Sequence, residues 1–234
     1  MKAERLAAYD WPAIEHALDA SGWARLPALL TPAECASLAA LYAEPQRFRS
    51  RVVMARHGYG QGDYQYFAYP LPPLVETLRR ALYGRLAPTA RRWRAALGQP
   101  AEFPCALGDY LAECHAAGQT RPTPLLLSYG PGDYNRLHQD VYGERLFPLQ
   151  ATVLLSEPGR DFEGGEFVLT EQRARMQSRV DVVPLEAGDA VAFAVRERPV
   201  ASARGWTRAA MRHGVSRIRA GERKTLGIIF HDAA

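Results

Sequence analysis

Apolar residues at helical spacing dominate the first half of the chain. From Trp11 to Ala20 the apolar side chains recur every three or four residues, which predicts a helix with one buried face. Thr31-Pro-Ala-Glu34 has the pattern of a capping box with proline at the first helical position, so a second helix is predicted to about Ala43. Further segments are predicted as helices over Leu74–Leu86, Thr89–Leu97 and Cys105–Ala117, and as a strand over Phe48–Met54.

After Arg121-Pro-Thr-Pro124 the pattern changes to short apolar runs separated by turns such as Gly164-Gly165. Strands are predicted over Leu125–Tyr129, Leu149–Ser156, Glu166–Leu169, Asp181–Leu185, Ala190–Ala194, Gly214–Ile218 and Thr225–Phe230. Many short strands with frequent turns predict a jelly roll, because closing the sheets leaves few unpaired strand edges. Residues 58–69, rich in glycine and tyrosine, fit neither pattern.

These patterns predict an α+β protein of one domain, residues 1–234. Residues 1–124 are expected to form a mainly helical region that braces one face of the β structure. Residues 125–234 are expected to form the β core that carries the chemistry, because the candidate site residues lie there.

Composition fits a protein with an ordinary hydrophobic core. Of the 234 residues 47% are hydrophobic, and no apolar run approaches the ~18 residues that a membrane span needs. Cys35, Cys105 and Cys114 have no metal-binding spacing and are interpreted as reduced thiols. With no apolar signal segment near the N-terminus, the chain is predicted to be cytoplasmic. The net charge of +4 does not by itself argue for nucleic acid.

A candidate metal site comes from His138-Gln-Asp140 together with the distant His213. Two residues apart on a strand, His138 and Asp140 would point to the same face. Two histidines and one carboxylate on one face of a metal, with open positions opposite, are the ligands of non-haem Fe(II) oxygenases. His138 and Asp140 alone would also suit zinc or manganese; His213, expected at the start of a strand, is what favours iron.

Arg223 follows the turn Ala220-Gly-Glu222 and is expected to point into the barrel, while Lys224 faces outward. Fe(II) with one aspartate carries a single positive charge, and a bound 2-oxoglutarate dianion turns this into a single negative charge. A guanidinium would neutralise the assembly and pair with a carboxylate through two hydrogen bonds. A solvent-exposed turn arginine is the alternative interpretation.

With these residues the sequence resembles the 2-oxoglutarate/Fe(II)-dependent oxygenases, in particular their bacterial prolyl-4-hydroxylase-like branch. The motifs are Tyr129-Gly-Pro-Gly-Asp-Tyr134, His138-Gln-Asp140, Gly164-Gly-Glu-Phe167, Gly188-Asp-Ala-Val-Ala-Phe193 and the segment from His213 to Arg223. The resemblance covers residues 125–232 and implies a double-stranded β-helix with N-terminal helices packed against the larger sheet.

By this resemblance, His138, Asp140 and His213 would bind iron, Arg223 would bind the distal carboxylate of 2-oxoglutarate, and Tyr129 would line the same pocket. The implied reaction consumes O₂, releases succinate and CO₂, and hydroxylates a substrate carbon. The metal and the cosubstrate would carry out the oxidation itself, so no further catalytic residue is expected beyond the metal ligands. Ascorbate is a candidate reductant.

The substrate entrance is expected near Gln139 and the predicted loop Arg196–Arg212, which carries five arginines, among them Arg208, and Trp206. Hydroxylation of a peptidyl or prolyl substrate is the leading hypothesis. Oxidative demethylation of alkylated nucleic acid and a non-enzymatic jelly-roll metal-binding or sensor protein are the alternatives. No membrane partner is expected, and the sequence does not indicate the oligomeric state or whether residues 58–69 cover the site.

Overall fold

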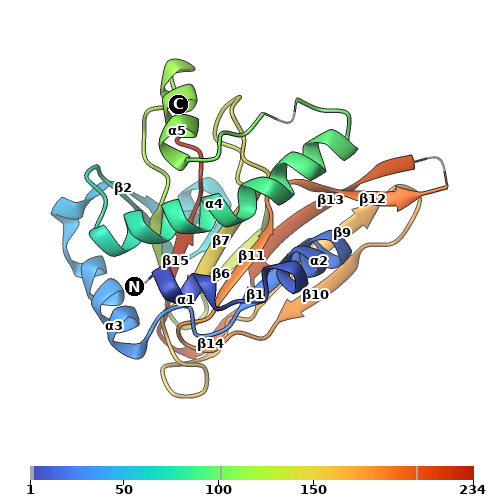
Figure 1. The fold of residues 1–234 in the computed structure, drawn as a ribbon. Helices are drawn as coiled ribbons and strands as arrows, with labels where there is room; N and C mark the ends of the chain where they lie inside the picture. The colour runs from blue at the N-terminus through green and yellow to red at the C-terminus, as the bar shows by residue number, and fades with distance from the viewer. Residues whose placement is uncertain (1–2, 101, 204) are drawn as a thin grey trace.

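A computed structural model describes residues 3–100, 102–203 and 205–234 of the chain (Figure 1). The helices are α1 (Ala3–Ala7), α2 (Trp11–Ser21), α3 (Pro32–Ala40), α4 (Pro73–Ala96) and α5 (Leu107–Ala116). The predicted capping box is confirmed at the start of α3, where Glu34 N donates to Thr31 Oγ1 at 3.2 Å and Thr31 N donates to Glu34 Oε2 at 2.8 Å. Among the described residues, no helix combines the length and apolar character needed to cross a membrane.

The prediction of two helices over residues 74–97 is wrong, because α4 continues through Pro88. Proline removes one helical hydrogen bond and its ring crowds the carbonyl four residues earlier. That earlier residue is Gly84, on the exposed side of the helix, where an added Cβ would meet no side chain. The buried face of α4 includes Leu82 and Leu86 before the proline and Ala90 after it, so packing against the core holds the helix together across the break.

The strands form antiparallel sheets. They are β1 (Trp23–Leu26), β2 (Phe48–Val53), β3 (Gly60–Gln61), β4 (Asp63–Phe67), β5 (Leu125–Tyr129), β6 (Tyr134–His138), β7 (Leu149–Leu154), β8 (Phe162–Gly164), β9 (Phe167–Arg173), β10 (Arg179–Val183), β11 (Ala190–Ala194), β12 (Glu197–Ser202), β13 (Gly205–Val215), β14 (Ile218–Gly221) and β15 (Arg223–Ile228). The larger sheet has the order β1-β11-β7-β15-β5-β4-β2, and the smaller has the order β10-β9-β13-β6-β3 with β12 beside β13. Strands β14 and β8 form a separate pair.

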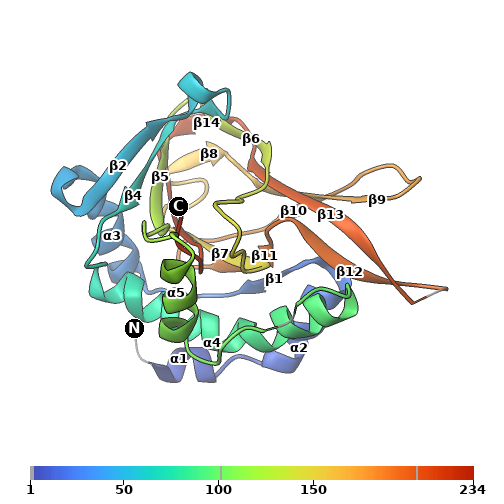
Figure 2. The same cartoon turned by 90° about the horizontal axis from the view of Figure 1, so that it is seen from above.

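The two sheets face each other around the barrel interior, and α1, α2 and α4 lie outside the larger sheet (Figure 2). The predicted α+β double-stranded β-helix, with N-terminal helices against the larger sheet, is therefore confirmed. The first 124 residues also supply β1 to β4. Of these, only β2 was expected from the sequence, because the other three are short and lie in segments without a clear apolar period.

Several expectations for the second half need correction. Strands β6 and β8 were not predicted, and the segment Arg196–Arg212, expected to be a loop, forms most of the β12–β13 hairpin. This hairpin extends away from the barrel in both views (Figures 1 and 2), so most of it lacks the apolar alternation of a strand within a core. Arg204, one of the five arginines of this segment, lies outside the described residues. His213 consequently lies near the end of a long strand rather than at the start of one.

Strand alternation divides the larger sheet into two surfaces. On β7, Leu149, Ala151 and Val153 belong to the hydrophobic core that also contains the helix residues Leu82 and Leu86. The alternate residues Gln150 and Thr152 line a pocket between the sheets. The larger sheet therefore has an apolar face that holds the helices and a partly polar face that builds the candidate site.

Candidate active site

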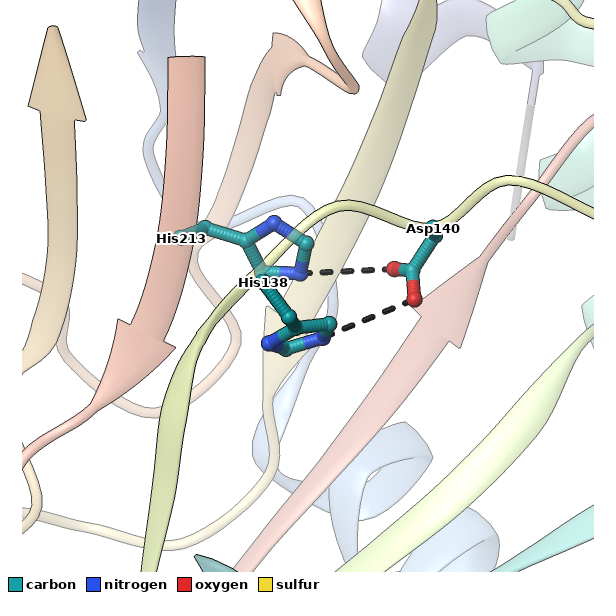
Figure 3. Close-up of side chains that lie close together, drawn as sticks. All are labelled: His138, Asp140 and His213. Atoms are coloured by element: carbon teal, nitrogen blue, oxygen red, sulfur yellow. Dashed lines mark ion pairs between the residues drawn. The ribbon is translucent and has the colours of Figure 1, made fainter. Parts of the chain in front are cut away.

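The sequence motif and the distant histidine meet on the smaller sheet. His138 at the end of β6 pairs directly with His213 on β13, and their ring centroids are 4.2 Å apart. Asp140 reaches both rings (Figure 3), with Oδ1 3.5 Å from His138 Nε2 and Oδ2 3.3 Å from His213 Nε2. The candidate ligand atoms of the three residues all lie within 4.8 Å of one another.

Asp140 reaches this position differently from the expectation. Strand β6 ends at His138, so Asp140 lies in the following loop and strand alternation does not aim its side chain. Gln139 fixes the start of that loop, because its Nε2 donates to Arg196 O at 3.0 Å and to Met211 O at 2.8 Å. The carboxylate is then oriented by hydrogen bonds from other side chains.

Two residues that sequence reasoning did not select hold the Asp140 carboxylate. Tyr142 Oη donates to Asp140 Oδ1 at 2.7 Å, and Gln150 Nε2 donates to Asp140 Oδ2 at 2.8 Å. Such outer hydrogen bonds fix the orientation of a metal-binding carboxylate. A signal for Gln150 was available, since Gln150 and Thr152 are the polar residues that interrupt the run Leu149–Leu155.

The protonation states fit a metal site. The short contact of His138 Nδ1 with Arg136 O, at 2.7 Å, requires an N–H at Nδ1 and leaves Nε2 for a metal. Burial opposes ionisation of Asp140, but the adjacent His138 and His213 hold its pKa well below the usual value. Burial also opposes protonation of His138, but the neighbouring Asp140 outweighs it and raises the pKa of His138. Burial, with the nearby His138, lowers the pKa of His213. The charged carboxylate of Asp140 and the neutral imidazole of His213 are in the state that metal binding requires, and His138 would reach that state by releasing a proton when a metal binds.

A pocket of about 280 Å³ extends from these residues between the two sheets. Its lining includes Arg223 and Tyr129, which lie opposite each other on β15 and β5. The Arg223 side chain is buried, and its Nε and Nη1 have no hydrogen-bond partner among the described residues. Burial lowers the pKa of Arg223 to about 10, which still leaves it charged at neutral pH. A buried, unpaired guanidinium costs several kcal/mol of free energy, and binding an anion would offset that cost.

These residues fit an Fe(II) ion and 2-oxoglutarate. Ligands at ~2.1 Å from a common ion and at right angles lie roughly 3 Å apart, close to the 3.3 Å and 3.5 Å separations of Asp140 from the two histidines. Two imidazoles and one carboxylate on one side match the donor set of non-haem iron enzymes. The unpaired Nε and Nη1 of Arg223, in the same pocket, match one carboxylate of 2-oxoglutarate.

The predicted entrance residues lie in different places. Gln139 lines the pocket, Arg208 lines a neighbouring one, and Trp206 lines neither. Trp206 is exposed near the tip of the β12–β13 hairpin, seven residues or roughly 24 Å along β13 from His213. Arg198 is buried and paired with Glu171, with Nη2 2.5 Å from Oε2, so it does not contribute to a cationic rim.

The tyrosine-rich segment 58–69 contributes to the pocket in part. Tyr59 and Tyr64 line it, and Tyr59 is half exposed at its mouth. Tyr66 instead meets Tyr142 edge to face, and Tyr69 donates a 2.8 Å hydrogen bond to Asp232. The segment therefore forms one wall of the pocket with its first tyrosines and packs against the protein with its last.

Comparison with known proteins identifies the family. The profile of the Oxygenase-NA family, described as an oxygenase catalysing oxidative methylation of damaged DNA, matches residues 62–233. An uncharacterized protein of Mycobacterium tuberculosis (strain H37Rv) is 54% identical over 168 residues, which is 72% of this chain and 72% of that protein.

Solved structures with a similar fold include a prolyl-4-hydroxylase of Pseudomonas putida, with a TM-score of 0.54 and 18% identity, covering 93% of this chain and 96% of the hydroxylase. An oxidoreductase of the 2OG-Fe(II) oxygenase family from Burkholderia pseudomallei has a TM-score of 0.55 and 19% identity, covering 97% of this chain and 94% of that one. Identities this low establish the fold and not the substrate. The chain therefore belongs to the Oxygenase-NA family of oxygenases, and it has the fold of the enzymes whose cofactors are Fe(II) and 2-oxoglutarate.

Proposed function

We propose that His138, Asp140 and His213 bind Fe(II) and that Arg223 binds the distal carboxylate of 2-oxoglutarate. The observation that carries this proposal is the buried guanidinium of Arg223, unpaired at Nε and Nη1, in the same pocket as the three candidate metal ligands. A structural arginine would be expected to have an acidic partner at this depth. Tyr129, opposite Arg223 on the neighbouring strand, would form the second wall of the carboxylate site.

In this proposal the side chains of the protein bind the metal and 2-oxoglutarate and orient the metal ligands. Tyr142 and Gln150 hold the Asp140 carboxylate, and Arg136 O holds the His138 ring, so that three ligand atoms face the pocket. Fe(II) and 2-oxoglutarate, when bound, supply the oxidising chemistry, in which O₂ is consumed, succinate and CO₂ are released, and a substrate C–H becomes C–OH. The surrounding apolar side chains, including Leu127 and Phe193, limit the access of water.

An alkylated base in DNA is the substrate class that we favour. Tyr59 is 50% exposed at the pocket mouth, and His57 stacks on it with ring centroids 5.3 Å apart. Flat side chains in this position suit a base that has left the DNA stack. Arg136, exposed on β6, donates its backbone N–H to Tyr59 O at 2.9 Å and so lies beside this mouth. The family description, which refers to damaged DNA, supports the same choice.

The chemistry of demethylation follows from hydroxylation. A methyl group on a base nitrogen would gain one oxygen atom from O₂, and the other oxygen would enter succinate. The resulting N–CH₂OH group then loses formaldehyde and leaves N–H on the base. Protein residues need only hold the methyl carbon next to the metal site formed by His138, Asp140 and His213.

Hydroxylation of a peptidyl proline is the second candidate. The motif resemblance favoured it, and the pocket wall formed by Leu125, Leu127 and Val215 would accept an apolar ring. The structural similarity to prolyl hydroxylases supports the shared fold and leaves the substrate open.

Product analysis of the His138→Ala variant tests the oxygenase proposal. Wild-type protein with Fe(II) and 2-oxoglutarate should release succinate, and His138→Ala should lose at least 100-fold of this activity. His16→Ala, which removes an exposed histidine of α2, is the matched control and should behave as wild type. Equal succinate release by His138→Ala and wild type would remove His138 from the metal site.

The substrate is tested by supplying methylated single-stranded oligonucleotides or proline-containing peptides to the wild-type protein. Stimulated succinate release together with formaldehyde, only with the oligonucleotide, is the expected result. Stimulation by the peptide, with a gain of one oxygen atom in its mass, would favour the second candidate.

A further inference from the structure

A second pocket lies directly beside the candidate active site. It has a volume of about 170 Å³ and shares Val141 with the active-site pocket. Its walls come from the end of α4, from the loop that follows Asp140, and from the base of the β12–β13 hairpin. A molecule that fills the first pocket and continues past Val141 would therefore enter the second.

Three arginines line this second pocket: Arg94, Arg196 and Arg208. Arg196 is exposed, and none of its side-chain nitrogens has a hydrogen-bond or ion-pair partner among the described residues. Arg208 is also exposed, and it forms a long ion pair with Glu197, in which Nε lies 3.9 Å from Oε2, beyond hydrogen-bond distance. One oxygen of Glu197 already accepts a 2.9 Å hydrogen bond from Gln99.

Arg94 forms the fixed inner wall of the pocket. Its Nη1 donates to Gln99 Oε1 and its Nη2 donates to Leu146 O, both at 2.8 Å, so its guanidinium plane is held in place. Its Nε is buried and has no partner in the part of the chain that the structure describes. Burial lowers the pKa of Arg94; Tyr110 and Glu197 oppose this shift, and the positive charges of Arg196 and Arg208 add to it. The three cations are therefore close enough to repel one another.

Like charges gathered in a concave site, with only Glu144 and Glu197 as acidic groups in its lining, favour an anion there. Guanidinium groups match the oxygens of phosphate by forming parallel hydrogen bonds. The apolar part of the wall includes Leu97, Leu146 and Pro148, and it strengthens electrostatic attraction by excluding water.

We infer that the Arg94, Arg196 and Arg208 pocket binds a backbone phosphate of a DNA strand whose neighbouring nucleotide occupies the active site. This inference rests on the proposed function, because it assigns the flanking phosphate of the substrate proposed there. It gives Arg208, expected at the substrate entrance, a specific ligand. Arg196 and Arg208 would make the adjustable contacts, and Arg94 would supply the fixed charge.

Fluorescence anisotropy of a labelled single-stranded DNA oligonucleotide tests this assignment. The double variant Arg196→Ala/Arg208→Ala should bind at least 10-fold more weakly than wild type. Because each phosphate contact on single-stranded DNA contributes about 0.7 to the slope of log K against log salt, the slope should decrease in magnitude by about 1.4. The matched control is Arg212→Ala/Arg219→Ala, which removes two exposed arginines outside both pockets and should bind within about 2-fold of wild type.

Further measurements separate this inference from the proposed function. Both double variants should release succinate from 2-oxoglutarate, without oligonucleotide, at the wild-type rate; if wild type releases none, the oxygenase proposal fails whatever the binding result. Equal weakening of DNA binding in the two double variants, or no DNA binding by wild type, would overturn the phosphate site. Binding of a phosphorylated peptide or inorganic phosphate in place of DNA, lost in Arg196→Ala/Arg208→Ala, would overturn its assignment to a DNA strand.

Discussion

At the scale of single residues, the buried Arg223 lowers the stability of the protein without a ligand and provides the charge that would bind 2-oxoglutarate. A buried charge without a partner costs free energy of folding, and that cost is recovered when an anion binds. Tyr129 and Phe162 lie near the guanidinium, with ring centroids 5.7 Å and 5.8 Å from Cζ, and they offset only part of the lost hydration. The protein without 2-oxoglutarate should therefore carry a local instability at this position.

Replacing Arg223 by methionine should separate the two effects. Without metal and 2-oxoglutarate, Arg223→Met should be more stable than wild type by about 1–3 kcal/mol in urea unfolding, because an unpaired buried charge is removed. In binding titrations the same variant should need about 100-fold more 2-oxoglutarate, while its metal affinity should change little. Arg223→Lys, which keeps a charge, is the control and should gain no stability. A less stable Arg223→Met protein would contradict the interpretation of Arg223 as an unpaired site residue.

The buried His231 predicts how the free energy of unfolding depends on pH. Burial lowers its pKa from 6.5 to about 4. Between these two pH values His231 is protonated in the unfolded chain and neutral in the folded protein. The contribution of neutral His231 is fully present above pH 6.5 and is lost as the pH falls from 6.5 toward 4, by up to about 3 kcal/mol.

The comparison with His231→Gln isolates this contribution from the carboxylates, because glutamine does not titrate. Wild type should exceed the variant in unfolding free energy by more at pH 7 than at pH 4.5, as measured by urea unfolding at both values. A difference between the two proteins that stays constant with pH would show that His231 does not titrate as expected.

At the scale of elements, α4 shows how packing decides where a helix ends. The sequence breaks its pattern at Pro88, but the buried face continues from Leu82 to Trp93 and the helix follows that face. The opposite, exposed surface contains Gly84, where an added Cβ would have no atom within 4 Å apart from the adjacent backbone of its own helix.

Gly84→Ala should therefore stabilise the protein by about 0.5–1 kcal/mol, because alanine loses less backbone entropy in a helix. Thermal unfolding followed by circular dichroism measures this. Gly221→Ala is the contrasting variant and should destabilise, since Gly221 has a φ of +76° and its Cβ would lie 2.1 Å from Asp161 O. Destabilisation by Gly84→Ala would mean that the helix surface there contacts something.

At the scale of the whole molecule, the site joins both sheets. The smaller sheet supplies His138 and His213, and the larger supplies Gln150 and Arg223. Ligands that bind between the sheets should therefore stabilise the complete fold rather than one element.

Mn(II) and 2-oxoglutarate together, at 100 times their dissociation constants, should add about 2.7 kcal/mol for each ligand. For a protein of this size that corresponds to an increase in Tm of about 5–10 °C per ligand, measured by differential scanning fluorimetry. The His138→Ala variant should lose the metal response, and Arg223→Ala should keep it but lose the response to 2-oxoglutarate. A full response in both variants would place the ligands elsewhere.

The sequence by itself indicated most of the helices, several of the core strands and the residues proposed for the candidate site. Apolar period and turn residues are local properties, which is why β5 and β11 were predicted with their observed bounds. His138, Asp140, His213 and Arg223 were selected because their chemistry is readable from residue type and order.

Only the tertiary structure decided how these residues meet. Asp140 is aimed by Tyr142 and Gln150, contacts that depend on a loop and a distant strand and have no local signature. The β12–β13 hairpin forms by pairing between exposed, arginine-rich segments whose composition resembles a loop. The second basic pocket likewise exists only because α4, the loop after Asp140 and this hairpin converge in space.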